Sequence, residues 1–324
     1  MKKLENFINK KNNLIKLFTP GPASLLKENI LGIAPCFGRG DRNYLKTEKR
    51  VLSKLKKLSG QKNIVCMQGS GSAALESVAL NFFKGRILIV KTGYYSDRLL
   101  FLSKLAKKTH KFIKKIDYVD WKKINNYKKK ADWIWACYTE TSIGFKLPIH
   151  ELQNLAKKTR AKLALDATAS IGLENNHKFA EVVSFSSCKG LFGLTGASFV
   201  SYNSEPKNYV NSFVLNLKNI KNKKMTGPYH IIQSLDHVLK NYNNLKKSVI
   251  TNKRIIEKKY NKFLIYKKKN QPLLCTYLNK KIKKNNSKTI LYKPRIKING
   301  SVISHLGEVH LGKNAKGEIL NYIK

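Results

Sequence analysis

Short apolar runs alternate with longer segments of helical periodicity over the larger part of the chain, and this alternation limits the possible folds more than any other feature. The runs have the length of buried strands, and the segments between them have the repeat of amphipathic helices. Such runs occur at 63–67 (NIVCM), 86–90 (RILIV), 132–138 (DWIWACY), 162–166 (KLALD), 181–187 (EVVSFSS) and 196–202 (GASFVSY). Because strands that alternate with helices are typical of βαβ units, we predict an α/β fold with a mainly parallel central sheet.

The sequence changes in character after about residue 229. Residues 230–264 have long helical periodicity, and the strand-like pieces PLLCTYL and TILYKPRIKI follow. We therefore predict a large domain over residues 15–235 and a smaller α+β domain over residues 236–324, with a connecting helix that leads into it. Residues 1–14 are expected to pack on the smaller domain.

The chain has a formal net charge of +45, from 64 Lys and Arg against 19 Asp and Glu, and such an excess attracts polyanions. The lysines are mixed with Asn and Ile, which are residues of A/T-rich codons, and they are spread along the whole chain. Arginine, which reads phosphates and base edges best, is scarce. We interpret the charge as codon bias and expect no specific nucleic-acid partner; a nucleic-acid-binding protein on an inactive enzyme scaffold is the remote alternative.

The five cysteines are far apart and form no CxxC pair, so the sequence predicts neither a metal site nor a disulfide framework. The N-terminus contains no uninterrupted apolar stretch, and no later window approaches the length of a membrane span. We therefore expect a soluble cytoplasmic protein without a membrane partner.

Several predicted strands end in small or polar residues. In open α/β sheets the binding crevice lies beyond the carboxyl ends of the strands, so these side chains are expected to converge. Ser70, Gly71 and Ser72 form a Gly/Ser turn after the run 63–67 and directly before a helical segment. Their hydroxyls and the free N–H groups of a helix N-terminus favour phosphate binding. A plain strand–helix turn is the alternative.

A carboxylate and a lysine follow two later strands. Asp166 closes an apolar strand, where its burial is costly unless a donor such as a protonated ring nitrogen pairs with it; an N-cap is the alternative. Lys189 follows the run 181–187 among Ser, Cys and Gly, with no carboxylate nearby in the sequence. Such surroundings lower the pKa of an ammonium group and make it a nucleophile for a Schiff base. A solvated surface lysine is the alternative.

An aromatic turn and a polar loop complete the set. The turn is GYYS at 93–96, and the loop YTETSIG at 138–144 offers Glu140, Thr141 and Ser142 to fix a hydroxyl or phenolate; a simple turn is the alternative. Pyridoxal phosphate requires an anion site, an aromatic ring to stack on, a carboxylate for its ring nitrogen and a lysine for attachment. The order and spacing of these features predict pyridoxal phosphate as the cofactor.

Motifs in one order along most of the chain resemble those of a known family. They are FTPGPASL, MQGSGSAALESV, LIVKTGYYSDR, YTETSIGFKLPI, LALDATASIG, SSCKGLFGLTGASFV, MTGPYH and HLGEV. The chain resembles the class V aminotransferases of the fold-type I pyridoxal-phosphate enzymes, and among them most the 2-aminoethylphosphonate–pyruvate transaminases. The resemblance implies a homodimer that moves an amino group from an aminophosphonate or small amino acid to a 2-oxo acid.

The resemblance also implies roles for individual residues. Lys189 would bind the cofactor and then move the proton of the substrate Cα, and Asp166 would pair with the pyridine nitrogen. The other residues implied to bind the cofactor are Ser70, Gly71 and Ser72 at the phosphate, Tyr95 stacked on the ring, Thr141 at the phenolic oxygen, Thr168 against the other ring face, and Thr226 at the phosphate of the neighbouring subunit.

The sequence departs from the family pattern where the substrate carboxylate binds. The family has an arginine near the C-terminus, and alignment on LGEV puts Val302 there, which removes a bidentate clamp. Arg295 or His305 could take over this role, as could Arg39 or Arg42, although none matches the motif. The missing clamp keeps a pyridoxal-phosphate-dependent lyase on the same fold open as an alternative.

Overall fold

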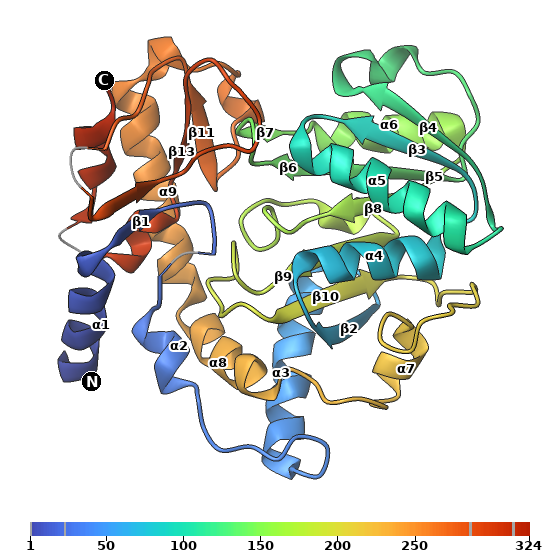
Figure 1. The fold of residues 1–324 in the computed structure, drawn as a ribbon, viewed down its shortest axis with the longest axis horizontal. Helices are drawn as coiled ribbons and strands as arrows, with labels where there is room; N and C mark the ends of the chain where they lie inside the picture. The colour runs from blue at the N-terminus through green and yellow to red at the C-terminus, as the bar shows by residue number, and fades with distance from the viewer. Residues whose placement is uncertain (1, 23, 285–286, 313–314) are drawn as a thin grey trace.

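The computed structural model describes residues 2–22, 24–284, 287–312 and 315–324. Its centre is a seven-stranded sheet with the strand order β2-β10-β9-β8-β5-β3-β4 (Figure 1). These strands are β2 (Asn63–Gln68), β3 (Gly85–Lys91), β4 (Ile113–Asp120), β5 (Trp133–Cys137), β8 (Lys162–Asp166), β9 (Val182–Ser186) and β10 (Ala197–Tyr202). Strand β10 is antiparallel to both of its neighbours, and the other neighbouring pairs are parallel. The predicted α/β fold with a mainly parallel sheet is confirmed.

Helices cover both faces of this sheet. One face carries α3 (Arg42–Ser59), α6 (Ile149–Thr159) and α8 (Tyr229–Lys240), and the other carries α4 (Gly71–Phe82), α5 (Tyr94–Thr109) and α7 (Leu217–Lys221). Side chains alternate along each strand: in β3, Leu88 and Val90 join the core on the first face, and Ile87 and Ile89 join the core on the second. Burial on both faces explains why the strands are continuous apolar runs.

The first and last parts of the chain lie together at one side of the sheet (Figure 1). They contain α1 (Lys2–Leu14), β1 (Lys16–Phe18), α2 (Lys27–Leu31), α9 (Tyr242–Lys259), β11 (Cys275–Leu278), β12 (Thr289–Leu291) and β13 (Ser301–Ser304). Strand β1 pairs in parallel with β12, and β11 pairs antiparallel with β13. The Asn12 side chain on α1 donates a hydrogen bond to the carbonyl of His310 at 2.7 Å. A short hairpin of β6 (Thr139–Glu140) and β7 (Phe145–Lys146) follows β5.

Two features of the fold differ from the sequence analysis. The segment 230–264 contains two helices instead of one connecting helix, because the chain leaves the helical conformation at Asn241, between α8 and α9. The Asn241 amide donates a hydrogen bond to Glu28 Oε1 at 2.9 Å, which favours this interruption. Strand β4 was not predicted, because it is an edge strand whose exposed residues break up the apolar pattern. Within the described ranges, no helix has the length and apolarity that crossing a membrane requires.

One carboxylate is buried in the C-terminal part. Glu308 is 3% exposed, and its Oε1 accepts a hydrogen bond from the backbone N of Ile319 at 2.8 Å. Burial raises the pKa of Glu308 to about 7, the nearby Glu318 carboxylate adds to the rise, and the backbone donors oppose it. The folded protein therefore favours the neutral form of Glu308 up to neutral pH.

We expect Glu308 to make the stability of the protein depend on pH. Because its folded pKa of about 7 lies above the ordinary value of 4.5, its stabilising contribution is complete below the ordinary pKa and is lost as the pH rises through 7. Urea denaturation should show a fall in the free energy of unfolding of up to roughly 3 kcal/mol from this group across that range. Glu308→Gln should remove most of this slope, and an unchanged slope would contradict the assignment.

Candidate active site

The carboxyl ends of the parallel strands open on a cavity of about 290 Å³. Most of the residues that the sequence analysis selected contribute to its wall. They are Ser70, Gly71, Ser72, Tyr95, Thr141, Asp166, Thr168, Lys189 and Arg295. A larger cavity of about 640 Å³ lies between α1, α2 and α9, but it contains none of these residues.

The acid and the amine line the same cavity. Asp166 ends β8 and is 4% exposed, and its Oδ1 accepts a hydrogen bond from the backbone N of Thr168 at 2.9 Å. The Lys189 Nζ lies 5.1 Å from the centre of the Tyr95 ring. The Cys137 thiol lines the same cavity; burial and Asp166 raise its pKa, and Lys189 lowers it. Neither Asp166 nor Lys189 forms an ion pair within the described ranges, so both are available to a ligand.

The backbone at Gly21 lies directly against the lysine. Gly21 has a φ of +110°, and a Cβ at this position would be 2.8 Å from both Lys189 Cγ and the carbonyl oxygen of Cys188. Residues with a side chain rarely adopt this φ, so both the conformation and the space require glycine. The N-terminal segment therefore closes the cavity on the side of Lys189.

Helix α4 begins at the cavity wall, and its N-terminus favours an anion there. Ser70 is its N-cap residue, but the Ser70 hydroxyl makes no capping hydrogen bond. The N–H groups of the first turn lack partners within the helix, and the helix dipole favours negative charge there. Arg98 on α5 donates a hydrogen bond to Ser72 Oγ at 3.0 Å, which adds a cation to this site.

Arg98 was not among the residues predicted from the sequence. The spacing in YYSDR could have indicated it. Residues three and four positions apart lie on the same face of a helix, so Arg98 shares a face with Tyr95 and Tyr94. The Arg98 guanidinium carbon accordingly lies 5.1 Å from the centre of the Tyr95 ring and 5.6 Å from that of Tyr94.

Glu140 holds the aromatic turn in place. Its Oε2 accepts hydrogen bonds from the backbone N of Tyr95 at 3.0 Å and of Ser96 at 3.1 Å, and its Oε1 accepts one from the backbone N of Ser142 at 3.2 Å. Burial raises the pKa of Glu140, and these hydrogen bonds oppose the rise. Glu140 thus caps α5 and fixes Tyr95, whereas its neighbour Thr141 lines the cavity.

Buried hydroxyl groups around the cavity lack partners. The Oγ1 atoms of Thr139 and Thr168 form no hydrogen bond with any described residue. Buried polar atoms nearly always have a partner, so these groups favour a polar ligand. A phosphorylated pyridine fits the residues present, since its phosphate suits the N-terminus of α4 and its ring nitrogen suits Asp166.

Some of the selected residues lie outside the cavity. His305 is fully buried with its Nε2 at 2.8 Å from Thr276 Oγ1, and burial lowers its pKa to about 3. Thr226 is exposed in a separate hollow beside β2. Arg39 and Arg42 do not line the cavity either. Of the residues that the sequence suggested for binding the substrate acid group, Arg295 is therefore the one that lines the cavity.

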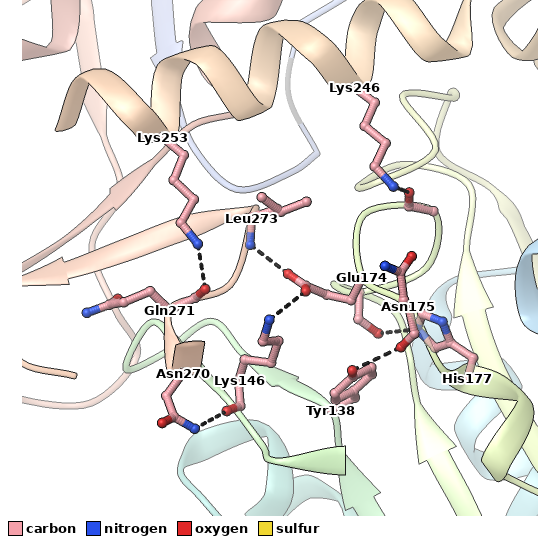
Figure 2. A network of polar contacts seen from close by, with 12 residues as sticks. Tyr138, Lys146, Glu174, Asn175, His177, Lys246, Lys253, Asn270, Gln271 and Leu273 are labelled. Atoms are coloured by element: carbon pink, nitrogen blue, oxygen red, sulfur yellow. Dashed lines mark hydrogen bonds and ion pairs between the residues drawn. The ribbon is translucent and has the colours of Figure 1, made fainter. Parts of the chain in front are cut away.

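Glu174 connects the loop after Asp166 to the C-terminal part (Figure 2). Its Oε2 lies 2.9 Å from the Nζ of Lys146 on β7, and its Oε1 accepts a hydrogen bond from the backbone N of Leu273 at 2.6 Å. The Glu174 side chain is only 6% exposed, so solvent screens this ion pair weakly.

One lysine of α9 adds to this connection, and a second makes a bond within the C-terminal part (Figure 2). Lys253 donates a hydrogen bond to the carbonyl of Gln271 at 2.6 Å, and Lys246 donates one to the carbonyl of Gly172 at 2.8 Å. Burial lowers the pKa of both amines. The C-terminal part is thereby attached to the loop that carries the cavity residues.

Comparison with known proteins identifies the family. The family model described as "Aminotransferase class-V" matches residues 42–233, which is more than half of the chain. The chain belongs to the class V aminotransferase family. Among solved structures, an alanine–glyoxylate aminotransferase from Nostoc sp. is similar with a TM-score of 0.76 and 15% identity, covering 94% of this chain and 95% of that one. The structural similarity covers 94% of this class V aminotransferase, so it extends beyond residues 42–233, which the family model matches.

Curated relatives are similar over part of their length. An uncharacterized aminotransferase of Helicobacter pylori is 25% identical over 171 residues, which are 49% of this chain and 45% of the relative. A bifunctional phosphonoacetaldehyde hydrolase/aminoethylphosphonate transaminase of Clostridioides difficile is 25% identical over 275 residues, which are 77% of this chain and 43% of the relative. The chain thus matches less than half of the length of these relatives.

Proposed function

We propose that this class V aminotransferase uses pyridoxal phosphate to move an amino group from a small donor to a 2-oxo acid. The observation that carries the proposal is the single cavity that contains Lys189 and Asp166, each without an ion-pair partner among the described residues. The unpartnered threonine hydroxyls and the helix N-terminus at the same cavity support it. Membership of the family supports it independently.

The residues of the chain would hold the cofactor at both ends. The N-terminus of α4, Ser72 and Arg98 would bind the phosphate, and Asp166 would accept a hydrogen bond from the ring nitrogen and keep it protonated. Tyr95 would cover the ring, and Thr141 would donate to its phenolic oxygen. When bound, pyridoxal phosphate supplies an aldehyde for the amine and an electron-withdrawing ring.

Lys189 would bind the aldehyde through its Nζ and then act as the base for the substrate. Once the donor has replaced it, the same Nζ would take the proton from the donor Cα, and in the second half-reaction it would give a proton to the Cα derived from the 2-oxo acid. Gly21 on one side and Tyr95 on the other confine the lysine side chain to this region. We place aminophosphonates and small amino acids among the donors, with the aminoethylphosphonate transaminase relative as support.

The cofactor assignment is tested by absorbance. After unbound cofactor has been removed, wild-type protein incubated with pyridoxal phosphate should keep a visible band, because attachment to a lysine amine retains the cofactor and changes its spectrum. Lys189→Ala should lack this band, and Lys258→Ala, which removes an exposed lysine of α9, should retain it. Asp166→Asn should retain the band but lower the rate with donor by roughly 100-fold or more. A wild-type protein that stays colourless would contradict the proposal.

The reaction type is tested with donor alone. A transaminase should release one stoichiometric burst of carbonyl product and continue only when a 2-oxo acid is added, because the amino group must leave the enzyme. A lyase on the same fold would turn over continuously without any acceptor. The donor set should contain 2-aminoethylphosphonate, alanine, serine and taurine.

We also propose a homodimer in which Thr226 reaches the phosphate end of the other subunit's cavity. The segment before α3 exposes apolar side chains, and Phe37 is 80% exposed. Gly38 beside it packs against the Tyr229 ring, which is close to Thr226 in the chain. Exposed apolar side chains around Thr226 favour a protein interface there.

Light scattering should therefore report a dimer for the wild-type protein. Phe37→Asp should shift the mass toward the monomer and weaken cofactor binding, because a charge inside an apolar contact is costly. Phe101→Asp is the matched control, since Phe101 is 64% exposed on α5, and it should leave the dimer intact. A monomeric wild-type protein with normal cofactor binding would contradict this part of the proposal.

A further inference from the structure

We propose that Arg295, held by Tyr94, binds the acid group of the substrate, an inference that rests on the proposed aminotransferase function. The acid group is a carboxylate or a phosphonate carried by a small donor or acceptor. Arg295 lines the same cavity as Lys189 and Asp166, so an acid bound there belongs to the molecule that reacts at the lysine.

The position of Arg295 is defined by an aromatic ring. Its Nη1 donates a hydrogen bond to Tyr94 Oη at 3.2 Å, and its guanidinium carbon lies 5.4 Å from the centre of the Tyr94 ring. The side chain is exposed and forms no ion pair with a carboxylate in the part of the chain that the structure describes. An arginine held by a neutral ring keeps its remaining N–H donors free for an anion.

The cations at the cavity divide into separate tasks. Among the described residues that line it, the cationic side chains are Lys189, Arg98 and Arg295. Arg98 is bonded to Ser72 at the N-terminus of α4, which is the end suited to the cofactor phosphate. Lys189 is the amine for the cofactor, so Arg295 is the cation that remains for the substrate.

Both guanidinium groups lie close to the Tyr94 side chain. Arg98 lies 5.6 Å and Arg295 5.4 Å from the centre of its ring. Hydrogen bonding to Arg295, and then to Arg98, lowers the pKa of the Tyr94 phenol, which reflects the positive potential at this edge of the cavity. This potential attracts an anion to the edge of the cavity that Arg295 lines.

The segment that carries Arg295 is attached on both sides. The backbone N of Tyr292 donates a hydrogen bond to the carbonyl of Phe18 at 3.2 Å, and the Tyr277 hydroxyl donates one to the carbonyl of Asn299 at 2.7 Å. The half-buried Tyr292 side chain packs against the cluster of Cys275, Tyr277 and Val302. Arg295 therefore extends from a fixed segment and not from a free loop.

Other candidates for the same role are occupied or buried. Val302 is fully buried in β13 against Tyr277 and Cys275, so this position presents no cation. His305 is bonded to Thr276, and with a pKa lowered to about 3 it is neutral at physiological pH. The acid-binding role that the sequence leaves unassigned at Val302 thus falls to Arg295.

The test measures binding of unreactive acids to the protein loaded with pyridoxal phosphate. Propionate and ethylphosphonate represent the two acid groups, and propionamide is the uncharged match of propionate. Titrations followed by cofactor absorbance and by calorimetry compare the wild type with Arg295→Met, Arg295→Lys and Tyr94→Phe. Arg254→Met is the matched control, because Arg254 is exposed on α9 and lies outside the cavity.

We expect Arg295→Met to weaken binding of at least one acid by roughly 10- to 100-fold, because hydrogen bonds to a charged group are lost. Arg295→Lys should retain part of the affinity, since a lysine keeps the charge but not the planar fork. Tyr94→Phe should cause a smaller loss, because it frees Arg295 without removing it. Propionamide binding and the visible cofactor band should be unchanged in every variant, and Arg254→Met should match the wild type throughout.

Specific outcomes would overturn the inference. If Arg295→Met and Arg295→Lys bind both acids as the wild type does, or lose propionamide to the same extent as propionate, Arg295 is not the acid site. The acid that responds more strongly identifies the substrate class, carboxylate or phosphonate. A wild-type protein without the cofactor band would count against the proposed function, whereas a normal band with unchanged acid binding would count against Arg295 alone.

Discussion

The charge of Asp166 at the end of a buried strand is the constraint on which the site depends. A carboxylate in such surroundings is costly unless donors or a cation compensate for the water it has lost. The backbone N of Thr168 compensates in part, and no described cation forms an ion pair with Asp166. The lysine in the same cavity is likewise unpaired. The fold therefore leaves a carboxylate and an amine unpaired at one cavity, so both are free for a ligand that carries a proton near one and an aldehyde near the other.

The N-terminal and C-terminal parts of the chain contribute residues to the cavity at the edge of the sheet. Gly21 brings the N-terminal segment against Lys189, and Arg295 extends into the cavity from the segment between β12 and β13. Glu174 and Lys246 attach the C-terminal part to the loop that follows Asp166 (Figure 2). A substrate site built from these separate parts depends on their relative positions, so the buried polar contacts at Glu174 are important for the site as well as for stability.

The strands and the residues at their ends could be predicted from the sequence for a physical reason. Burial on both faces makes the strands continuous apolar runs, and the parallel arrangement brings their carboxyl ends to one edge. Ser72, Asp166 and Lys189 are accordingly found around one cavity. Strand β4 was not predicted, because an exposed edge strand lacks this continuous apolar pattern. The break at Asn241 was not predicted either, because the helical periodicity continues across it.

Residues placed by tertiary contacts could not be predicted in the same way. Arg98 reaches the N-terminus of α4 only because α4 and α5 pack together over one face of the sheet. The role of Glu140 depends on the β6–β7 hairpin meeting the N-terminus of α5. The sequence suggested Arg295 only as one of several basic residues, and its access to the cavity follows from contacts of its segment with Phe18 and Tyr277, which are distant in the chain.

The central claim is that one cofactor molecule joins the amine of Lys189 to the neighbourhood of Asp166. Reduction of the pyridoxal-phosphate-loaded protein with borohydride makes the bond between cofactor and lysine permanent, and peptide mass spectrometry then locates it. The account predicts a single modified peptide, with the pyridoxyl group on Lys189. A modification spread over surface lysines, or its absence from the peptide that contains Lys189, would contradict the account.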